Sequence, residues 1–263
     1  MSTSRQMTRL YDEILFTRQL LGHGLTYLRK SSFINKGIYF NSFNSLCLGL
    51  ERLCKICLIL DYVRENGKYP EYNYIRKFGH DLKKLILEVE SISVDRCEFT
   101  ELHMMIISHL SNFSESKGRY SNIDFITKGS TIDPINEWHD IDKYIVDYLL
   151  TDSDKKKFKK LVTDYQSIDK YIPTIVCGHE SDSRENIASS GEFFQQCTRF
   201  EVVSGYRVLF IIQIIEKLFH ILLNVNDRLS RDFYVSELGR VFAVFFYGTD
   251  SEKRKRMNFI RDS

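Results

Sequence analysis

The stretch that decides the fold is FNSLCLGLERLCKICLIL, residues 43–60. Apolar side chains recur in it at steps of three and four residues, the spacing of one face of an α-helix, and they are Phe43, Leu46, Leu50, Leu53, Cys57 and Leu60. Leu48, Ile56 and Ile59 widen this stripe, so we expect the helix to be buried on more than one side. Asn66 and Gly67 should end it, because glycine readily adopts the left-handed conformation that follows a last helical turn.

Further helices are expected on both sides of this central helix. Apolar residues recur at helical spacing over residues 6–30, at Leu10, Ile14, Leu21, Leu25 and Leu28. Similar patterns predict helices over residues 99–113, 136–150, 153–167, 192–225 and 235–247. Polar residues and glycines predict loops over 31–37, 114–138 and 177–191. Only 3 Pro and 13 Gly occur in 263 residues, so we predict an all-α fold, a multi-helix bundle.

Composition and charge are those of a soluble globular protein, with 43% hydrophobic and 27% charged residues. The net charge of +2 argues against a globally basic nucleic-acid binder, so an RNA site would have to be a local patch. The N-terminus lacks the apolar core of a signal peptide, and a cytoplasmic location is expected. The most apolar stretch, residues 208–225, contains Glu216 and Lys217, which favours a buried helix over a membrane span.

The six cysteines are interpreted as reduced thiols, because four of them lie within apolar helical patterns. Cys54 and Cys57 form a lone CxxC pair inside a helix, which indicates core packing more than zinc or redox chemistry. Cys177, His179 and Glu180 are close in sequence, but no second cluster of metal ligands accompanies them. We therefore predict no metal and no cofactor.

Two charged residues interrupt the apolar central helix. Glu51 and Lys55 are four residues apart and share one helical face. They can form an ion pair at the edge of the core, or Glu51 can point at a functional group on the next helix. That helix carries Arg76 and His80, which share a face if the helix is unbroken at Gly79. If instead Asp81 caps a new helix, which would carry Leu82, Leu85, Ile86 and Val89, His80 lies just before its N-terminus.

The run ERLCKICLILDYVRENGKYP followed by IRKFGHDLKKL, residues 51–70 and 75–85, resembles the HEPN superfamily. In that superfamily a long helix with an internal acidic residue packs against a helix opened by a His-Asp-Leu signature. The resemblance covers roughly residues 41–113. It implies an antiparallel helical bundle, usually dimeric, and we expect a HEPN-like portion over residues 1–124. Residues 125–263 would then be a helical extension that packs on it or continues the same domain.

Many members of the superfamily are metal-independent endoribonucleases of toxin–antitoxin or antiphage systems, with an Arg and a His in an active site shared by two subunits. The resemblance implies that Arg76 stabilises the reacting phosphate, that His80 is the general base or acid, and that Glu51 orients one of them. Lys77, Lys83 and Lys84 flank the signature as expected RNA contacts. Only three residues separate Arg76 from His80, one fewer than in the catalytic pattern, so the match supports the fold more than the reaction.

Other features bear on an RNA partner. Arg119 could meet a phosphate and Tyr120 could stack on a base, or Tyr120 and Ile123 could pin the surrounding loop to the bundle. Two basic strips, residues 155–160 and 253–256, could bind a polyanion, or they could be a solvated helix face and a frayed tail. The leading hypothesis is an RNA-directed nuclease acting in prokaryotic defence as a homodimer or as a subunit of a defence complex. The alternative is a non-catalytic dimerisation or scaffold module.

Overall fold

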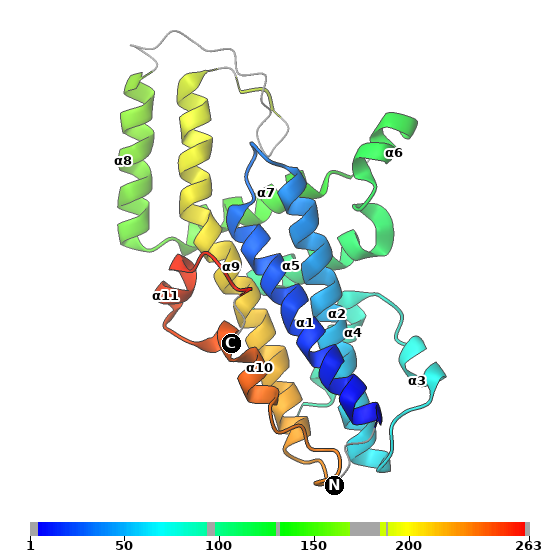
Figure 1. The fold of residues 1–263 in the computed structure, drawn as a ribbon. Coiled ribbons are helices and arrows are strands. Elements are labelled where there is room, and N and C mark those ends of the chain that lie inside the picture. The colour runs from blue at the N-terminus through cyan, green and yellow to red at the C-terminus, as the bar shows by residue number, and fades with distance from the viewer. Residues whose placement is uncertain (1–4, 94–97, 130–131, 169–184, 188, 261–263) are drawn as a thin grey trace.

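The helix that contains residues 43–60 lies at the centre of the protein, which is represented by a computed structural model that describes residues 5–93, 98–129, 132–168, 185–187 and 189–260. This helix, α2 (Gly37–Asn66), runs antiparallel to α1 (Arg5–Lys30), and the long α9 (Ser190–Asn226) packs against both (Figure 1). Gly67 has a φ of 65° and ends α2 in the left-handed conformation predicted from the sequence. The described part of the chain contains helices and no β-strand, which confirms the all-α prediction.

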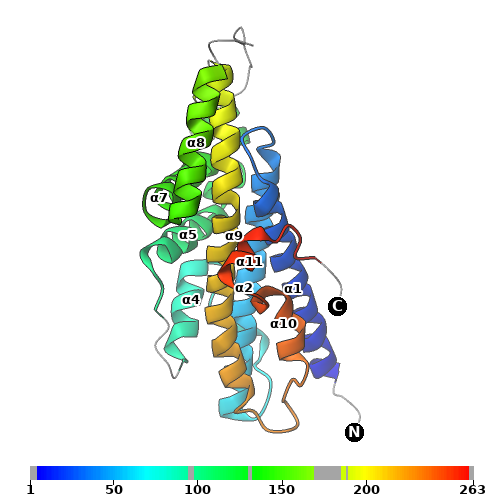
Figure 2. The same ribbon diagram turned by 90° about the vertical axis from the view of Figure 1, so that its left-hand side faces the viewer.

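The remaining helices cover the central three. Those before residue 130 are α3 (Tyr72–Arg76), α4 (Leu82–Ser91), α5 (Glu101–Asn112) and α6 (Ser121–Lys128). Those after it are α7 (Pro134–Tyr144), α8 (Asp152–Ile168), α10 (Leu238–Phe246) and α11 (Asp250–Lys255). Helix α4 packs on α2 and α9, whereas α8, α10 and α11 pack along α9 (Figure 2). Single π-helical turns extend α5 over Phe113–Lys117 and α7 over Ile145–Leu149.

One hydrophobic core runs through both halves of the chain. It joins Leu25 of α1 and Leu50 of α2 to Ile211 and Ile215 of α9, and all four are fully buried. The boundary expected near residue 124 therefore lies within α6, and the two sides of it share this core. The sequence pattern of α9, apolar on most of its surface, is typical of a helix covered on several sides.

Helix α9 is also the one described helix that is long and apolar enough to cross a membrane. In its most apolar window, 61% of the residues are buried inside the protein. Glu216 lies within the apolar part of α9, and its charge is neutralised by an ion pair with Lys253. Its burial supports the prediction of a central core helix.

One expectation about loops was wrong, and a second lies largely outside the described residues. Residues 114–138 were predicted to be a loop, but they contain α6, the first residues of α7 and a π-helical turn. Tyr120 and Ile123 were expected to pack the loop against the bundle. Instead both are 58% exposed, and α6 projects away from the bundle (Figure 1). The exposed loop predicted at 177–191 lies largely outside the described residues, and Ser190 and Gly191 already belong to α9.

The interpretation of residues 253–256 as a frayed tail was also wrong. Helix α11 begins with a capping box between Thr249 and Glu252. Lys253 is buried and paired with Glu216 of α9, which removes its charge from solvent. Arg256 donates hydrogen bonds to the backbone carbonyls of Val244 and Tyr247. The C-terminal segment is thus docked on the bundle by named polar contacts.

The described cysteines are free, as predicted. Cys47, Cys54 and Cys57 are buried in the core, and Cys197 is half-buried. Burial raises the pKa of the Cys54 thiol above its usual value, so it remains protonated and behaves as a small apolar group. This position confirms that the CxxC pair packs in the core. Cys97 and the Cys177, His179 and Glu180 group lie outside the described residues.

Candidate functional site

The chain turns sharply just before His80, and this turn creates the candidate site. Helix α3 ends at Arg76, and Gly79 adopts a φ of 63°, a conformation that glycine tolerates best. Asp81 then caps α4, because its carboxylate accepts a hydrogen bond from the Lys84 backbone N–H at 3.2 Å. Of the two placements that the sequence allowed, the structure has the broken helix, with His80 immediately before the cap.

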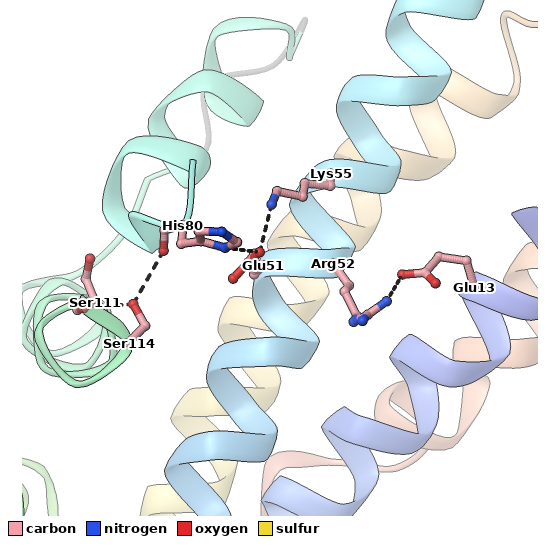
Figure 3. A network of polar contacts seen from close by, with 7 residues as sticks. All are labelled: Glu13, Glu51, Arg52, Lys55, His80, Ser111 and Ser114. Carbon is pink, nitrogen blue, oxygen red and sulfur yellow. Dashed lines mark hydrogen bonds and ion pairs between the residues drawn. The ribbon is translucent and has the colours of Figure 1, made fainter. Parts of the chain in front are cut away.

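Two serines at the end of α5 hold this turn in place. The Ser111 hydroxyl donates a hydrogen bond to the Asp81 carboxylate at 3.0 Å and accepts one from the Lys83 backbone N–H at 3.3 Å. The Ser114 hydroxyl is 3.4 Å from the His80 carbonyl oxygen (Figure 3). Burial would raise the pKa of Asp81, but the hydrogen bonds from Lys84 and Ser111 outweigh it and lower the pKa. The His80 backbone is therefore fixed from both sides.

The imidazole of His80 reaches across to the acid of the central helix. Its Nδ1 atom lies 2.9 Å from Glu51 Oε1, and Lys55 Nζ lies 2.7 Å from the same oxygen (Figure 3). The side chain of Glu51 is 12% exposed, whereas that of His80 is 79% exposed. Glu51 thus forms the expected ion pair with Lys55 and also points at a functional group on the next segment.

This geometry assigns the tautomer of a neutral His80. A carboxylate can only accept hydrogen bonds, so Nδ1 must carry the hydrogen that is donated to Glu51. The other ring nitrogen, Nε2, then has a free lone pair on a largely exposed ring. A histidine held by a carboxylate in this way is oriented as a general base, the arrangement that acid–base catalysis requires.

A cleft of about 640 Å³ opens in front of this pair. Its apolar wall comes from α2 and α3, with Leu48, Ile56, Ile59 and Ile75, and its polar lining includes Glu51, Lys55, His80, Ser114, Glu115 and Arg119. Arg52 also lines the cleft but is already paired with Glu13 of α1. Such a mixed lining of apolar walls with a few convergent polar groups is typical of a ligand-binding site.

Arg119 is the predicted RNA contact that the structure brings into this cleft. Its side chain is exposed, and within the described ranges it forms no ion pair with a carboxylate. A guanidinium presents a planar set of donors that matches the oxygens of a phosphate. Its neighbour Tyr120 is 58% exposed at the start of α6 and does not line the cleft.

Arg76 lies elsewhere. Its guanidinium is 5.0 Å from the ring centre of Tyr72, and it is not among the residues that line the cleft of His80. Lys77 stacks on the rings of Tyr74 and Phe78, at 4.2 and 4.7 Å. The predicted pairing of Arg76 with His80 in one groove is therefore not seen within this chain.

The other predicted RNA contacts lie on the exposed face of α4. Lys83 is exposed, and Lys84 is 78% exposed with its ammonium 3.4 Å from Asp81. They are close to His80 in sequence but are not among the residues that line the cleft. Serines 111 and 114, which hold the turn, carried no signal in the sequence, because their role depends on α5 packing beside α4.

A second hollow of about 600 Å³ adjoins the first, and both are lined by Glu13, Ile59 and Ile75. Its walls are mostly apolar and include Tyr69 and Tyr72. The described side chains include no group of three or more His, Cys, Asp or Glu residues placed to hold a metal ion. Comparisons with protein families, with curated proteins and with solved structures gave no match.

Proposed function

We propose that this protein is a metal-independent endoribonuclease, with His80 as general base and Glu51 as the residue that positions it. The observation that carries the proposal is the 2.9 Å contact between Nδ1 of an exposed histidine and a mostly buried carboxylate, at the mouth of a cleft. The resemblance of residues 51–85 to the HEPN superfamily supports a role in antiphage or toxin–antitoxin systems. On the same basis we propose a cytoplasmic protein that acts as a homodimer or within a defence complex.

The proposed reaction uses the ribose 2′-hydroxyl as nucleophile. Nε2 of His80 takes the proton from this hydroxyl, and the 2′-oxygen forms a bond to the adjacent phosphorus. The bond from phosphorus to the 5′-oxygen breaks, and that oxygen takes up a proton from solvent. Arg119 stabilises the negative charge on the phosphate oxygens in the transition state. The products are a 2′,3′-cyclic phosphate and a 5′-hydroxyl.

The adjoining hollow supports a single-stranded substrate. Tyr69 and Tyr72 offer aromatic faces on which an unpaired base can stack, and Arg5 and Arg9 lie at the same hollow. A nucleotide beside the cleaved phosphate would occupy this space. Arg76 lies over Tyr72, so its proposed contribution is to substrate binding beside the cleft.

The test is cleavage of single-stranded RNA by the purified full-length protein with EDTA present. We expect His80→Ala to lower the rate by about 10²–10⁴-fold, the usual contribution of a general base. Arg119→Ala should lower the rate by about 10²-fold or more, the usual effect of removing one donor to a developing negative charge. Arg76→Ala should have a smaller effect, seen mainly in KM.

Matched variants separate catalysis from folding. His220→Ala removes an exposed histidine on α9, and its activity should equal that of the wild type. Circular dichroism should show that each variant keeps its helical content. Equal activity of His80→Ala and the wild type, or no cleavage of any RNA by the wild type, would contradict the proposal.

A second candidate function is a non-catalytic interaction module, and α6 favours it. This helix projects from the bundle, and Tyr120, Ile123, Phe125 and Ile126 are 58–81% exposed. Apolar side chains grouped on one exposed element mark an interaction surface. Within this short helix, Asp124 and Lys128 form an ion pair at 2.9 Å, so its charge is balanced internally.

Light scattering after size exclusion tests this module. We expect a dimer whose dissociation constant rises at least about tenfold in Ile126→Asp, because a charge would be buried in the contact. Leu87→Asp, at an exposed position of α4, is the matched control and should leave the dimer intact. A wild-type protein that is strictly monomeric would contradict the module and count against the proposed dimeric nuclease.

A further inference from the structure

A second polar cleft, of about 420 Å³, shares no lining residue with the His80 cleft. It forms where the C-terminal end of α1 meets α8, α9 and α11. The residues of the cleft that can meet an anion are Arg29, Ser153, Lys157, Ser251, Arg254 and Lys255. The proposed nuclease function does not use this cleft.

Folding brings the two basic strips of the sequence together here. Lys157 comes from the strip at 155–160, and Arg254 and Lys255 come from the strip at 253–256. Helix α11 is held close to α9, because a Cβ atom on Gly205 would lie 2.6 Å from the Arg254 carbonyl oxygen. The buried ion pair of Lys253 with Glu216 fixes the same helix. From this position Arg254 reaches α8, where its Nη1 atom lies 2.9 Å from Asp154 Oδ2.

The positive charge of the cleft is not balanced by its own acids. Asp154 is already paired with Arg254: its Oδ2 atom accepts hydrogen bonds from Thr151 at 2.7 Å, Tyr206 at 2.6 Å and Arg254 at 2.9 Å. Glu201 is the other acid of the lining. The cleft also contains three positive side chains, those of Arg29, Lys157 and Lys255. Neither lysine forms an ion pair in the part of the chain that the structure describes.

Arg29 gives the strongest indication that this cleft can bind an anion. Its guanidinium is half-buried and donates a hydrogen bond to the neutral Ser204 hydroxyl, and its Nε atom is buried without a hydrogen-bond partner among the described residues. Burial, and then the charge of nearby Arg207, lower the pKa of Arg29. A half-buried cation without a carboxylate partner is unfavourable, and a bound anion would relieve it.

We propose that this cleft binds a small phosphate-bearing molecule through Arg29, Lys157 and Lys255. Its volume lies within the range of small-molecule sites, roughly 300–1,000 Å³. Arginine and lysine together are the usual phosphate ligands. The Tyr206 ring is only 5% exposed and is covered by the Arg254 guanidinium at 4.4 Å, so no aromatic face is free for a base. Recognition therefore rests on the phosphate groups.

Calorimetric titration of the full-length protein with inorganic phosphate, inorganic pyrophosphate and ATP tests this site. We expect saturable binding of one pyrophosphate per chain, tighter than that of phosphate. Lys157→Gln and Lys255→Gln should each raise the dissociation constant by about tenfold, which corresponds to about 1.4 kcal/mol. Lys156→Gln, an exposed neighbour on α8 that does not line the cleft, should bind as the wild type does.

ATP binding equal to that of pyrophosphate would support recognition through the phosphates alone. The His80→Ala protein should bind pyrophosphate normally, so this site can be present even if the nuclease proposal fails. The proposal is overturned if none of the three compounds binds saturably, or if Lys156→Gln weakens binding as much as Lys157→Gln does. It is also overturned if only an RNA oligonucleotide binds in a way that depends on Lys157.

Discussion

Arg207 lies in the interior, 1% exposed, and its guanidinium forms a two-point ion pair with Asp142. Its Nε atom donates to Asp142 at 2.7 Å, its Nη2 atom contacts the second oxygen of the same carboxylate, and Nη1 donates to the Ser31 carbonyl oxygen at 3.1 Å. Asp142 is 2% exposed. Both charged groups are removed from water, so the favourable energy of the pair offsets the cost of burying each one.

Removal of Asp142 should therefore be strongly destabilising. We predict that Asp142→Ala lowers the free energy of unfolding by about 3–5 kcal/mol, because it removes the carboxylate that forms a two-point ion pair with a buried guanidinium. Urea denaturation followed by circular dichroism measures this. The double variant Asp142→Ala/Arg207→Met should recover much of the loss, since no charge then stays buried. A loss below about 1 kcal/mol in the single variant would contradict this account.

His109 makes the stability depend on pH. Its ring packs against Phe43 and Trp138, at centroid distances of 4.7 and 5.1 Å. Its Nδ1 atom lies 3.7 Å from Glu137 Oε2, and neither ring nitrogen has a hydrogen-bond partner among the described residues. Burial lowers the pKa of His109 to about 3. In the unfolded chain its pKa is about 6.5. Between these values the unfolded state binds a proton that the folded state does not, so stability falls as the pH falls below about 6.5.

Between pH 7 and pH 5 this histidine should lower the free energy of unfolding by about 2 kcal/mol. The measurement is urea denaturation at both pH values for the wild type and for His109→Leu. This substitution replaces the imidazole with an apolar side chain of similar size that cannot take up a proton. The variant should lose about 2 kcal/mol less over this range, because all other titrating groups are shared. An identical pH dependence in both proteins would show that His109 is not held neutral.

At the scale of elements, the α1–α2 hairpin depends on two glycines that let the helices approach closely. A Cβ atom on Gly49 would lie 2.7 Å from Leu21 Cδ2, and one on Gly24 would lie 2.6 Å from Leu46 Cγ. Each glycine thus accommodates a leucine from the partner helix. The two contacts are reciprocal, which fixes the position of one helix along the other.

Gly49→Ala should lower the free energy of unfolding by about 1–3 kcal/mol, because the added methyl group overpacks the contact with Leu21. Gly239→Ala in α10 is the matched control, since a Cβ atom there would meet nothing within 4 Å. The control should be neutral or stabilising by up to about 1 kcal/mol, through the lower entropy of the unfolded chain. Equal stabilisation by both substitutions would show that the helices do not touch at Gly49.

Most helices were predictable, including α8, which was expected over 153–167 and is observed over Asp152–Ile168, whereas α6 and α11 were missed. Helices α1, α2, α5 and α9 were predicted close to their observed bounds, because each buries a stripe of apolar residues. Helix α6 was mistaken for a loop, since glycines flank it and its apolar residues face solvent. Helix α11 was mistaken for a frayed tail, because the burial of Lys253 depends on Glu216, 37 residues earlier.

At the scale of the whole molecule, the candidate site was predictable only where it is local. The contact of Glu51 with the segment at His80 followed from an acid in an apolar helix and from the capping residue Asp81. The position of Arg119 in the cleft could not be predicted, because it depends on how the turn after α5 packs. The gathering of Arg29, Lys157 and Lys255 was equally hidden, because three distant segments supply them.

The chemistry of the RNA ends produced in EDTA tests the central claim most directly. A histidine that activates the ribose 2′-hydroxyl must leave a 2′,3′-cyclic phosphate on one fragment and a 5′-hydroxyl on the other. We predict these ends for the wild type and for His220→Ala, and their absence for His80→Ala. Fragments with a 3′-hydroxyl and a 5′-phosphate, or cyclic phosphate ends formed equally well by His80→Ala, would contradict the account.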